Sequence, residues 1–65
     1  GWREALGNEL FPLVAAHDEI HAGKITGMLL ELDQEEVVAL IADPALLTSR
    51  VEEAVGVLND YNKEQ

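Results

Sequence analysis

His17 and His21 are four residues apart, the spacing that lets two imidazoles on one helix face bind the same zinc ion. The zinc-protease motif has a glutamate directly after its first histidine, where this chain has Asp18, and no third ligand follows at a suitable spacing. If Asp18 caps the following helix, His17 lies outside that helix. We therefore predict two surface histidines in a turn, with no metal ion and no other cofactor.

The remaining polar residues also lack the spacing of a catalytic site. The acidic cluster of Glu31, Asp33, Glu35 and Glu36 has no glycine of the kind that turns a calcium loop, so helix capping and solvation explain it better. Lys24 and Thr26 are polar, but no histidine or cysteine is spaced to activate a nucleophile. The chain has no glycine-rich phosphate loop. We expect a protein that is not an enzyme.

The charge of the chain restricts its partners. Thirteen carboxylates against four basic residues give a net charge of −9 over 65 residues. This balance repels a nucleic-acid backbone, whose recognition needs a basic surface. No apolar run approaches the roughly 20 residues of a membrane span, and the absence of cysteine is compatible with the cytosol. We expect one domain over residues 1–65 that binds other proteins and neither nucleic acid nor membrane.

Capping signals and apolar periodicity predict four helices and no strand. The first runs over residues 2–16, and Pro12 within it should kink the helix. The second begins near Asp18 as N-cap and ends near Glu31. The third begins after Asp33, with Glu36 completing a capping box. The fourth begins at Asp43-Pro44 and continues to about residue 62. Short links should make successive helices spatial neighbours.

Each predicted helix has an apolar side that should face a common core. In chain order these residues are Leu6, Leu10, Leu13 and Val14; then Ala22, Ile25, Leu29 and Leu32; then Val37, Val38, Leu40 and Ile41; and last Leu47, Val51, Ala54, Leu58 and Tyr61. Phe11 lies at the edge of the first set, where core burial is the ordinary expectation for an aromatic residue.

Residues 24–31, Lys-Ile-Thr-Gly-Met-Leu-Leu-Glu, carry more apolar surface than one helix face can bury. On a helix advancing about 100° per residue, Met28 and Leu30 lie on opposite flanks of the core-facing side, roughly 160° apart. Gly23 and Gly27 each cost about 1 kcal/mol relative to alanine in a helix interior. We expect close approach of another backbone or of a bulky guest side chain to offset this cost. The pattern predicts a helix with a neighbouring helix or a groove on each side.

This segment, called here the signature segment, resembles the signature of the MLLE domain, also called PABC, the C-terminal module of cytoplasmic poly(A)-binding protein. Leu6-Gly7 and Leu10-Phe11-Pro12-Leu13 resemble the family's preceding segment, and Val51 with Glu53-Ala54-Val55 through Val57-Leu58 resembles its closing helix. The resemblance covers roughly residues 5–60. It implies an all-α fold, a small right-handed bundle or superhelix of four, up to five, helices.

The resemblance also implies a peptide-binding function. MLLE domains recognise short disordered motifs of PABP-interacting proteins that have an early leucine anchor and a later phenylalanine anchor. The family's phenylalanine pocket corresponds here to Gly7, Phe11, Lys24, Thr26, Gly27 and Leu30. Its leucine pocket, between the signature helix and the last helix, corresponds to Met28, Leu29, Glu31, Ala54, Val57 and Tyr61.

Departures from the family pattern leave the peptide preference open. Asn8 stands where many members have an acidic residue, and Tyr61 replaces a common histidine. The resemblance implies translation regulators, a release factor and deadenylation factors as sources of the peptides, a cytoplasmic location and a monomer. Two alternatives remain: the same module in a HECT-type ubiquitin ligase, and a helical bundle that self-associates through Met28 and Phe11.

Overall fold

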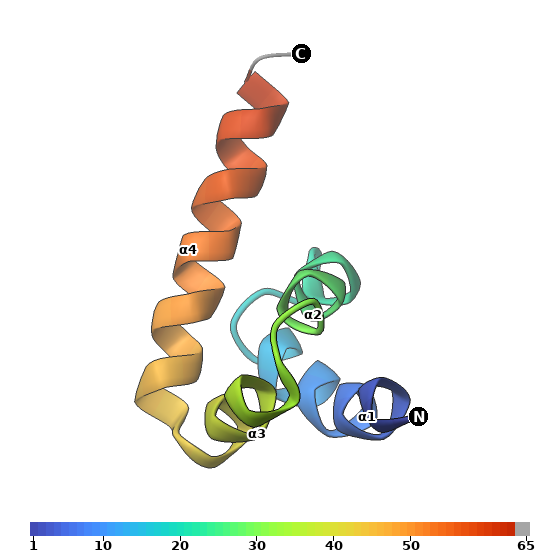
Figure 1. Cartoon of the computed structure of the whole chain (residues 1–65). Helices are drawn as coiled ribbons and strands as arrows, with labels where there is room; N and C mark the ends of the chain where they lie inside the picture. Colours follow the sequence, from blue (N-terminus) through green and yellow to red (C-terminus); the bar gives the residue numbers. More distant parts are fainter. Residues whose placement is uncertain (64–65) are drawn as a thin grey trace.

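The computed structural model describes the backbone of residues 1–63 and the side chains of residues 1–60. It contains four helices, α1 (Trp2–Ala15), α2 (Ala22–Leu29), α3 (Gln34–Ala42) and α4 (Pro44–Lys63), and residues 1–63 form no strand (Figure 1). The predicted all-α class and the four helices are confirmed.

Helix α1 has the apolar face that its sequence predicts. Leu10 and Val14 are fully buried, whereas Leu13 is 38% exposed and lies toward the edge. Phe11 is 47% exposed, so the ordinary expectation of core burial is wrong for this residue. Pro12 lies inside the helix, where its ring nitrogen has no hydrogen to donate to the carbonyl of Asn8.

The start of α2 differs from the sequence prediction. The helix begins at Ala22 and not directly after Asp18. The Asp18 carboxylate instead accepts hydrogen bonds from the backbone N–H of His21 (3.1 Å) and pairs with its Nδ1 (2.9 Å). At the other end of the link, the carbonyl of Val14 accepts from the N–H groups of His17 (2.9 Å) and Asp18 (3.0 Å). Asp18 therefore holds the turn between α1 and α2 and does not cap α2.

Helix α2 is also shorter at its carboxyl end than predicted. It ends at Leu29, so Leu30 and Glu31 lie in the turn that follows. The N–H of Leu30 donates to the carbonyl of Thr26 (3.0 Å) and that of Glu31 to Met28 (3.2 Å), which prolongs helical bonding into the turn.

The other two predicted aspartate caps have different outcomes. Asp43 caps α4 as predicted, because its Oδ1 accepts from the N–H groups of Ala45 (3.1 Å) and Leu46 (3.3 Å), with Pro44 as the first helical residue. Asp33 occupies the N-cap position of α3, but its side chain makes no capping hydrogen bond. The predicted capping box with Glu36 is therefore wrong.

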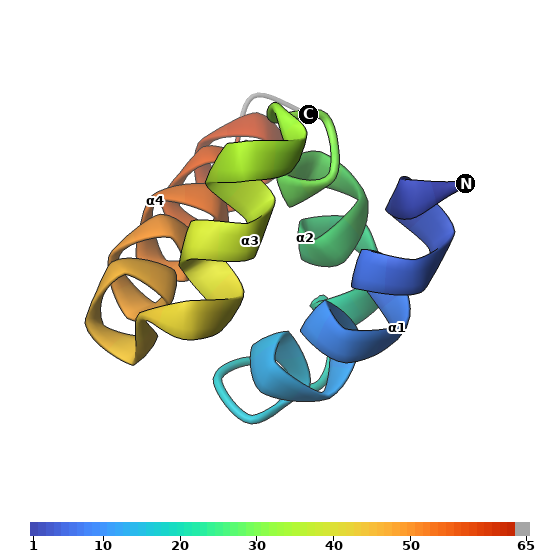
Figure 2. The same ribbon diagram turned by 60° about the horizontal axis from the view of Figure 1, so that its bottom comes forward.

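The helices pack in a closed order in which α1 contacts α2, α2 contacts α4, α4 contacts α3 and α3 contacts α1. In the view of Figure 2, α3 lies at the front, with α4 on its left and α2 on its right. Helices α2 and α3 follow each other in the chain but pack mainly against α1 and α4, so the predicted adjacency of successive helices fails at this link. The core consists of Leu10, Val14, Ala22, Ile25, Leu29, Val37, Leu40, Leu47, Val51 and Ala54.

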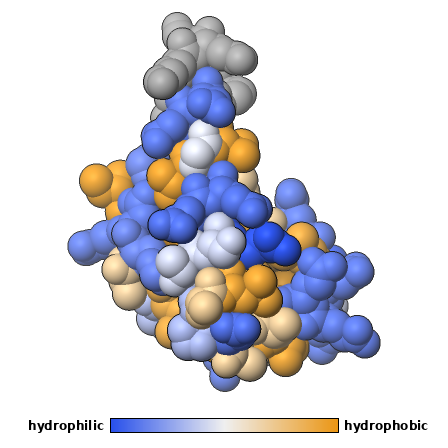
Figure 3. Space-filling model, turned by 90° about the vertical axis from the view of Figure 1, so that its left-hand side faces the viewer, coloured by the Kyte–Doolittle hydropathy of each residue, from blue (hydrophilic) through white to orange (hydrophobic). Residues whose placement is uncertain are grey.

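The outer surface of α4 mixes residue types. On the face seen in Figure 3, hydrophobic residues are interspersed with hydrophilic ones. Among the residues that the structure describes, every helix is too short or too polar to cross a membrane.

Candidate functional site

Helix α2 presents Met28 to a cavity of about 320 Å³ on its α4 side, called here the α2–α4 cavity. Its walls are Met28, Leu29, Ala54 and Val57, together with Leu32, Glu36, Arg50 and Glu53. Val57 is 58% exposed and Met28 is partly buried, so both offer apolar surface to an incoming side chain. The structure thus brings together four of the residues that the resemblance implies for a leucine pocket.

For the other two residues of that set, the structure gives no place in this cavity to Glu31 and does not describe the side chain of Tyr61. Glu31 is exposed in the turn after α2 and is not among the residues that line the cavity. The side chain of Tyr61 lies outside the described residues.

A second cavity, of about 400 Å³, adjoins the first. It is lined by Lys24, Met28, Val57 and Leu58 and is called here the Lys24 cavity. The resemblance implies Lys24 for the phenylalanine side, and in the structure the exposed Lys24 also lines this cavity toward α4. The reason is helical geometry, because Lys24 and Met28 are one turn apart and share a face of α2.

On the opposite side of α2, Leu30 packs against α1 at Gly7. Gly7 is buried, and a Cβ atom there would lie 3.0 Å from Cδ1 of Leu30. Phe11 is one turn after Gly7 on the same face of α1 and is half-exposed. Arg3 also joins α1 to the end of the signature segment, because its Nε donates a hydrogen bond of 3.1 Å to the carbonyl of Leu30.

Thr26 and Gly27 complete the set that the resemblance implies for a phenylalanine pocket. Thr26 is 7% exposed, and its Oγ1 is buried without a hydrogen-bond partner in the structure. Gly27 is exposed, and an added Cβ would meet no atom within 4 Å. No neighbouring backbone approaches Gly27, so packing inside the chain does not explain the glycine, and the open space beside it is available to a guest.

The two histidines face different partners. His21 pairs with Asp18, and this hydrogen bond, with the smaller effect of the His21 backbone N–H, lowers the pKa of the Asp18 carboxyl. His17 Nε2 lies 3.4 Å from Oγ1 of Thr48 on α4. Within residues 1–63, no group of three or more His, Asp or Glu side chains is placed to hold a metal ion.

Comparison with known proteins assigns the family. The sequence profile of the MLLE domain matches residues 2–58. The chain belongs to the MLLE domain family. It is 48% identical over 61 residues to polyadenylate-binding protein 4 of Arabidopsis thaliana, which covers 94% of the chain and 9% of that protein. It is also 48% identical over 63 residues to a polyadenylate-binding protein named cytoplasmic and nuclear, from Chaetomium globosum, which covers 97% of the chain and 8% of that protein.

The chain therefore spans less than a tenth of the length of these curated relatives. The MLLE domain is a non-catalytic module, in agreement with the expectation that the chain is not an enzyme.

Sequence reasoning missed several residues that line the cavities, namely Leu32, Glu36, Arg50, Glu53 and Leu58. A signal for some of them was present in the sequence. Arg50, Glu53 and Val57 follow each other at helical spacings of three and four residues, which places them on one face of α4. The resemblance assigns Val57 of this face to the leucine pocket, but it gives Arg50 and Glu53 no place in a site.

Proposed function

We propose that this MLLE domain binds a short, otherwise disordered peptide through a leucine anchor and a phenylalanine anchor on opposite sides of α2. The observation that carries the proposal is the position of α2. Met28 borders an open cavity toward α4, while Leu30 meets Gly7 of α1 on the other side. A single peptide that wraps around α2 can reach both surfaces.

The leucine anchor is assigned to the α2–α4 cavity. The cavity has apolar walls in Met28, Ala54 and Val57, and Leu29 forms its base. A volume of about 320 Å³ exceeds the space that one leucine side chain needs. Methionine adapts its shape to a guest, because its side chain is unbranched and polarizable.

The phenylalanine anchor is assigned to the α1 side of the signature segment. The half-exposed Phe11 supplies a ring for stacking, and Gly7 with Gly27 removes side-chain bulk around it. The Oγ1 of Thr26 is buried and has no hydrogen-bond partner in the structure, so we place Thr26 beneath this surface and not in direct contact with the peptide. Lys24 lines a cavity toward α4, so we place it on the path between the two anchors as well as at the phenylalanine side that the resemblance implies.

The expected affinity is in the micromolar range. Two buried anchors contribute about 2–3 kcal/mol each, and backbone hydrogen bonds add to this, but ordering a disordered segment opposes binding. A net free energy of about −7 to −9 kcal/mol corresponds to roughly micromolar dissociation constants.

An NMR titration tests the proposal. A peptide with both anchors should shift the amide signals of Met28, Ala54 and Val57 and also those of Gly7 and Leu30. The leucine-to-alanine peptide should lose the first set of shifts preferentially, and the phenylalanine-to-alanine peptide the second. Absence of any shift at about millimolar peptide, a thousandfold above the expected dissociation constant, would exclude the function.

For the parent protein we propose a polyadenylate-binding protein in which this domain recruits translation and mRNA-turnover factors in the cytoplasm as a monomer. The similarity to two proteins of that name supports this assignment. The alternative is the same domain in a HECT-type ubiquitin ligase. The coding sequence on either side of residues 1–65 distinguishes the two parent proteins. RNA-recognition motifs accompany the domain in a polyadenylate-binding protein, and a HECT domain accompanies it in the ubiquitin ligase.

A further inference from the structure

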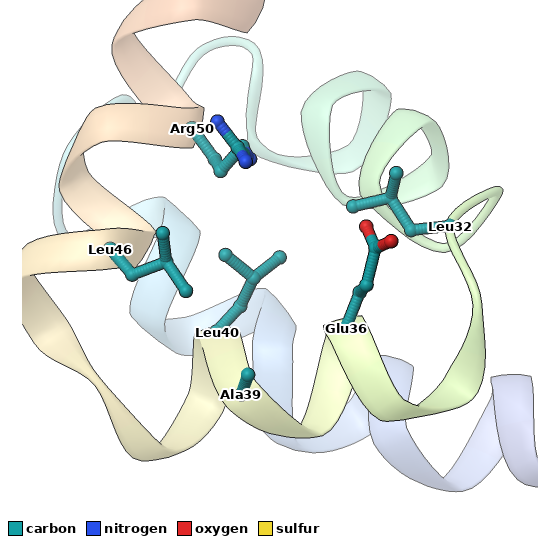
Figure 4. Close-up of a pocket in the computed structure, with 6 residues that line it drawn as sticks. All are labelled: Leu32, Glu36, Ala39, Leu40, Leu46 and Arg50. Carbon is teal, nitrogen blue, oxygen red and sulfur yellow. The ribbon is translucent and has the colours of Figure 1, made fainter.

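A third cavity, of about 160 Å³, lies between α3 and α4 and is called here the α3–α4 cavity. Figure 4 shows Leu40 of α3 and Leu46 of α4 turned toward each other, with Ala39 beside them. Arg50 reaches in from α4, and Glu36 rises from α3 toward Leu32. The cavity therefore has an apolar base and two opposite charges at its edge.

This cavity is continuous with the leucine site proposed above. Leu32, Glu36 and Arg50 line both cavities. On its far side, the α2–α4 cavity shares Met28 and Val57 with the Lys24 cavity. The three cavities therefore follow α4 in one row, in the order Lys24 cavity, α2–α4 cavity, α3–α4 cavity.

We propose that the α3–α4 cavity binds an apolar side chain of the peptide that precedes the leucine anchor. This inference rests on the proposed function. A peptide with its later phenylalanine on the α1 side and its leucine in the α2–α4 cavity enters the row from the end formed by Leu46 and Leu40. Its residues before the leucine therefore cross the α3–α4 cavity.

The dimensions set the position of this residue. On α4, the α3–α4 cavity is lined by Leu46 and Arg50 and the α2–α4 cavity by Arg50, Glu53, Ala54 and Val57. The centres of these two sets are about six residues apart, which is about 9 Å along the helix axis. An extended peptide covers that distance in about three residues. The apolar residue therefore lies two to four positions before the leucine.

The lining chemistry selects the type of residue. An apolar cavity of about 150 Å³ can hold a molecule of the size of benzene, so the 160 Å³ here accepts a valine or leucine side chain. Arg50 Nη1 lies 3.3 Å from Oε1 of Glu53, which holds the guanidinium near the groove. Its remaining N–H groups donate to a peptide carbonyl, and the Glu36 carboxylate accepts from a peptide N–H. An acidic peptide side chain is disfavoured, because it would meet two carboxylates for one guanidinium.

Calorimetric titration with three peptides tests the proposal. The first begins directly before the leucine anchor, the second carries a leucine three positions before it in an otherwise Gly/Ser extension, and the third has aspartate at that position. The leucine extension should tighten binding about three- to tenfold over the first peptide, and the aspartate extension should not. Equal affinities for all three peptides would overturn the inference, although binding of the first peptide would still support the proposed function.

Two variants locate the effect. Ala39→Leu fills the α3–α4 cavity from the exposed side of α3, so it should abolish the gain from the leucine extension and leave the first peptide unaffected. Ala42→Leu, on the same helix, exposed and away from the cavity, is the matched control and should retain the gain. An undiminished gain in Ala39→Leu would contradict the assignment to this cavity. If the first peptide fails to bind the unaltered domain, the proposed function itself fails, and this inference fails with it.

Discussion

Gly7 and Leu30 meet so closely that a methyl group on Gly7 would lie 3.0 Å from Cδ1 of Leu30. This contact joins α1 to the turn that ends the signature segment. The hydrogen bond from Arg3 to the carbonyl of Leu30 joins the same two parts of the chain. Two contacts therefore fix the α1 side of the proposed site. One of them, between Arg3 and Leu30, joins residues that are 27 positions apart in the sequence.

Gly7→Leu should destabilise the domain. The new side chain would enter a buried position already occupied by Leu30, and overpacking of this kind typically costs about 1–3 kcal/mol. Urea unfolding measures the change. Ala5→Leu, at an exposed position of the same helix, is the control and should unfold like the parent. Equal stability of Gly7→Leu and the parent would show that Leu30 moves away without cost.

Gly27→Ala should stabilise the fold and weaken peptide binding. Its Cβ would meet no atom within 4 Å, and alanine gains about 0.5–1 kcal/mol over glycine in a helix. The same methyl group occupies space that we assign to the phenylalanine ring.

Gly23→Ala is the matched control for this substitution, because Gly23 also lies on α2, is exposed and has no atom within 4 Å of an added Cβ. It should stabilise without affecting affinity. Thermal melts measure the stability and calorimetric titration the peptide affinity. An equal loss of affinity in the two variants would show that the phenylalanine ring of the peptide does not lie beside Gly27.

Met28→Ala and Leu29→Ala should separate binding from folding. Met28 is partly buried at the wall of two cavities, so its truncation should weaken peptide binding by about 1–2 kcal/mol. Leu29 is 5% exposed within the core, and its truncation should cost about 2–5 kcal/mol of folding free energy. Thermal melts give the stability and calorimetry the affinity. An unfolded Met28→Ala beside a stable Leu29→Ala would contradict the two-sided site.

Acid should weaken the turn between α1 and α2. The hydrogen bond to His21 lowers the pKa of Asp18 in the folded state, so the ionised carboxylate contributes stability above the ordinary aspartate pKa. That contribution is lost as the pH falls through the lowered pKa. Asp18→Asn removes the titration, so in urea unfolding the stability difference between parent and variant should shrink as the pH falls from neutral to below the ordinary aspartate pKa. A difference that stays constant over this range would exclude a role for the Asp18 carboxylate.

Poly(A) should not bind this domain at physiological salt. With a net charge of −9, the domain has almost no basic surface that could contact the phosphates and release the counterions of the nucleic acid. Fluorescence anisotropy with labelled poly(A) measures this, and submicromolar binding would contradict the proposed class of partner.

The sequence by itself determined the helices and the two-sided character of the signature segment. Periodic apolar residues such as Leu10, Val14, Ile25 and Val51 predicted the core, because an amphipathic helix buries its apolar side and leaves its polar side in water. The angle between Met28 and Leu30 predicted opposite sides of α2, and Asp43 with Pro44 predicted the start of α4. These features depend on local geometry, which sequence spacing encodes directly.

Only the tertiary structure decided what lies opposite each of these residues. Asp18 accepts hydrogen bonds from His21 within the turn before α2 and does not cap the helix, because α2 begins only at Ala22. Lys24 borders the α4 side, since the rotation of α2 follows from packing against α1 and α4 together. The row of cavities along α4 likewise arises where α2, the following turn and α3 meet one helix, and no periodicity within a single segment encodes that meeting.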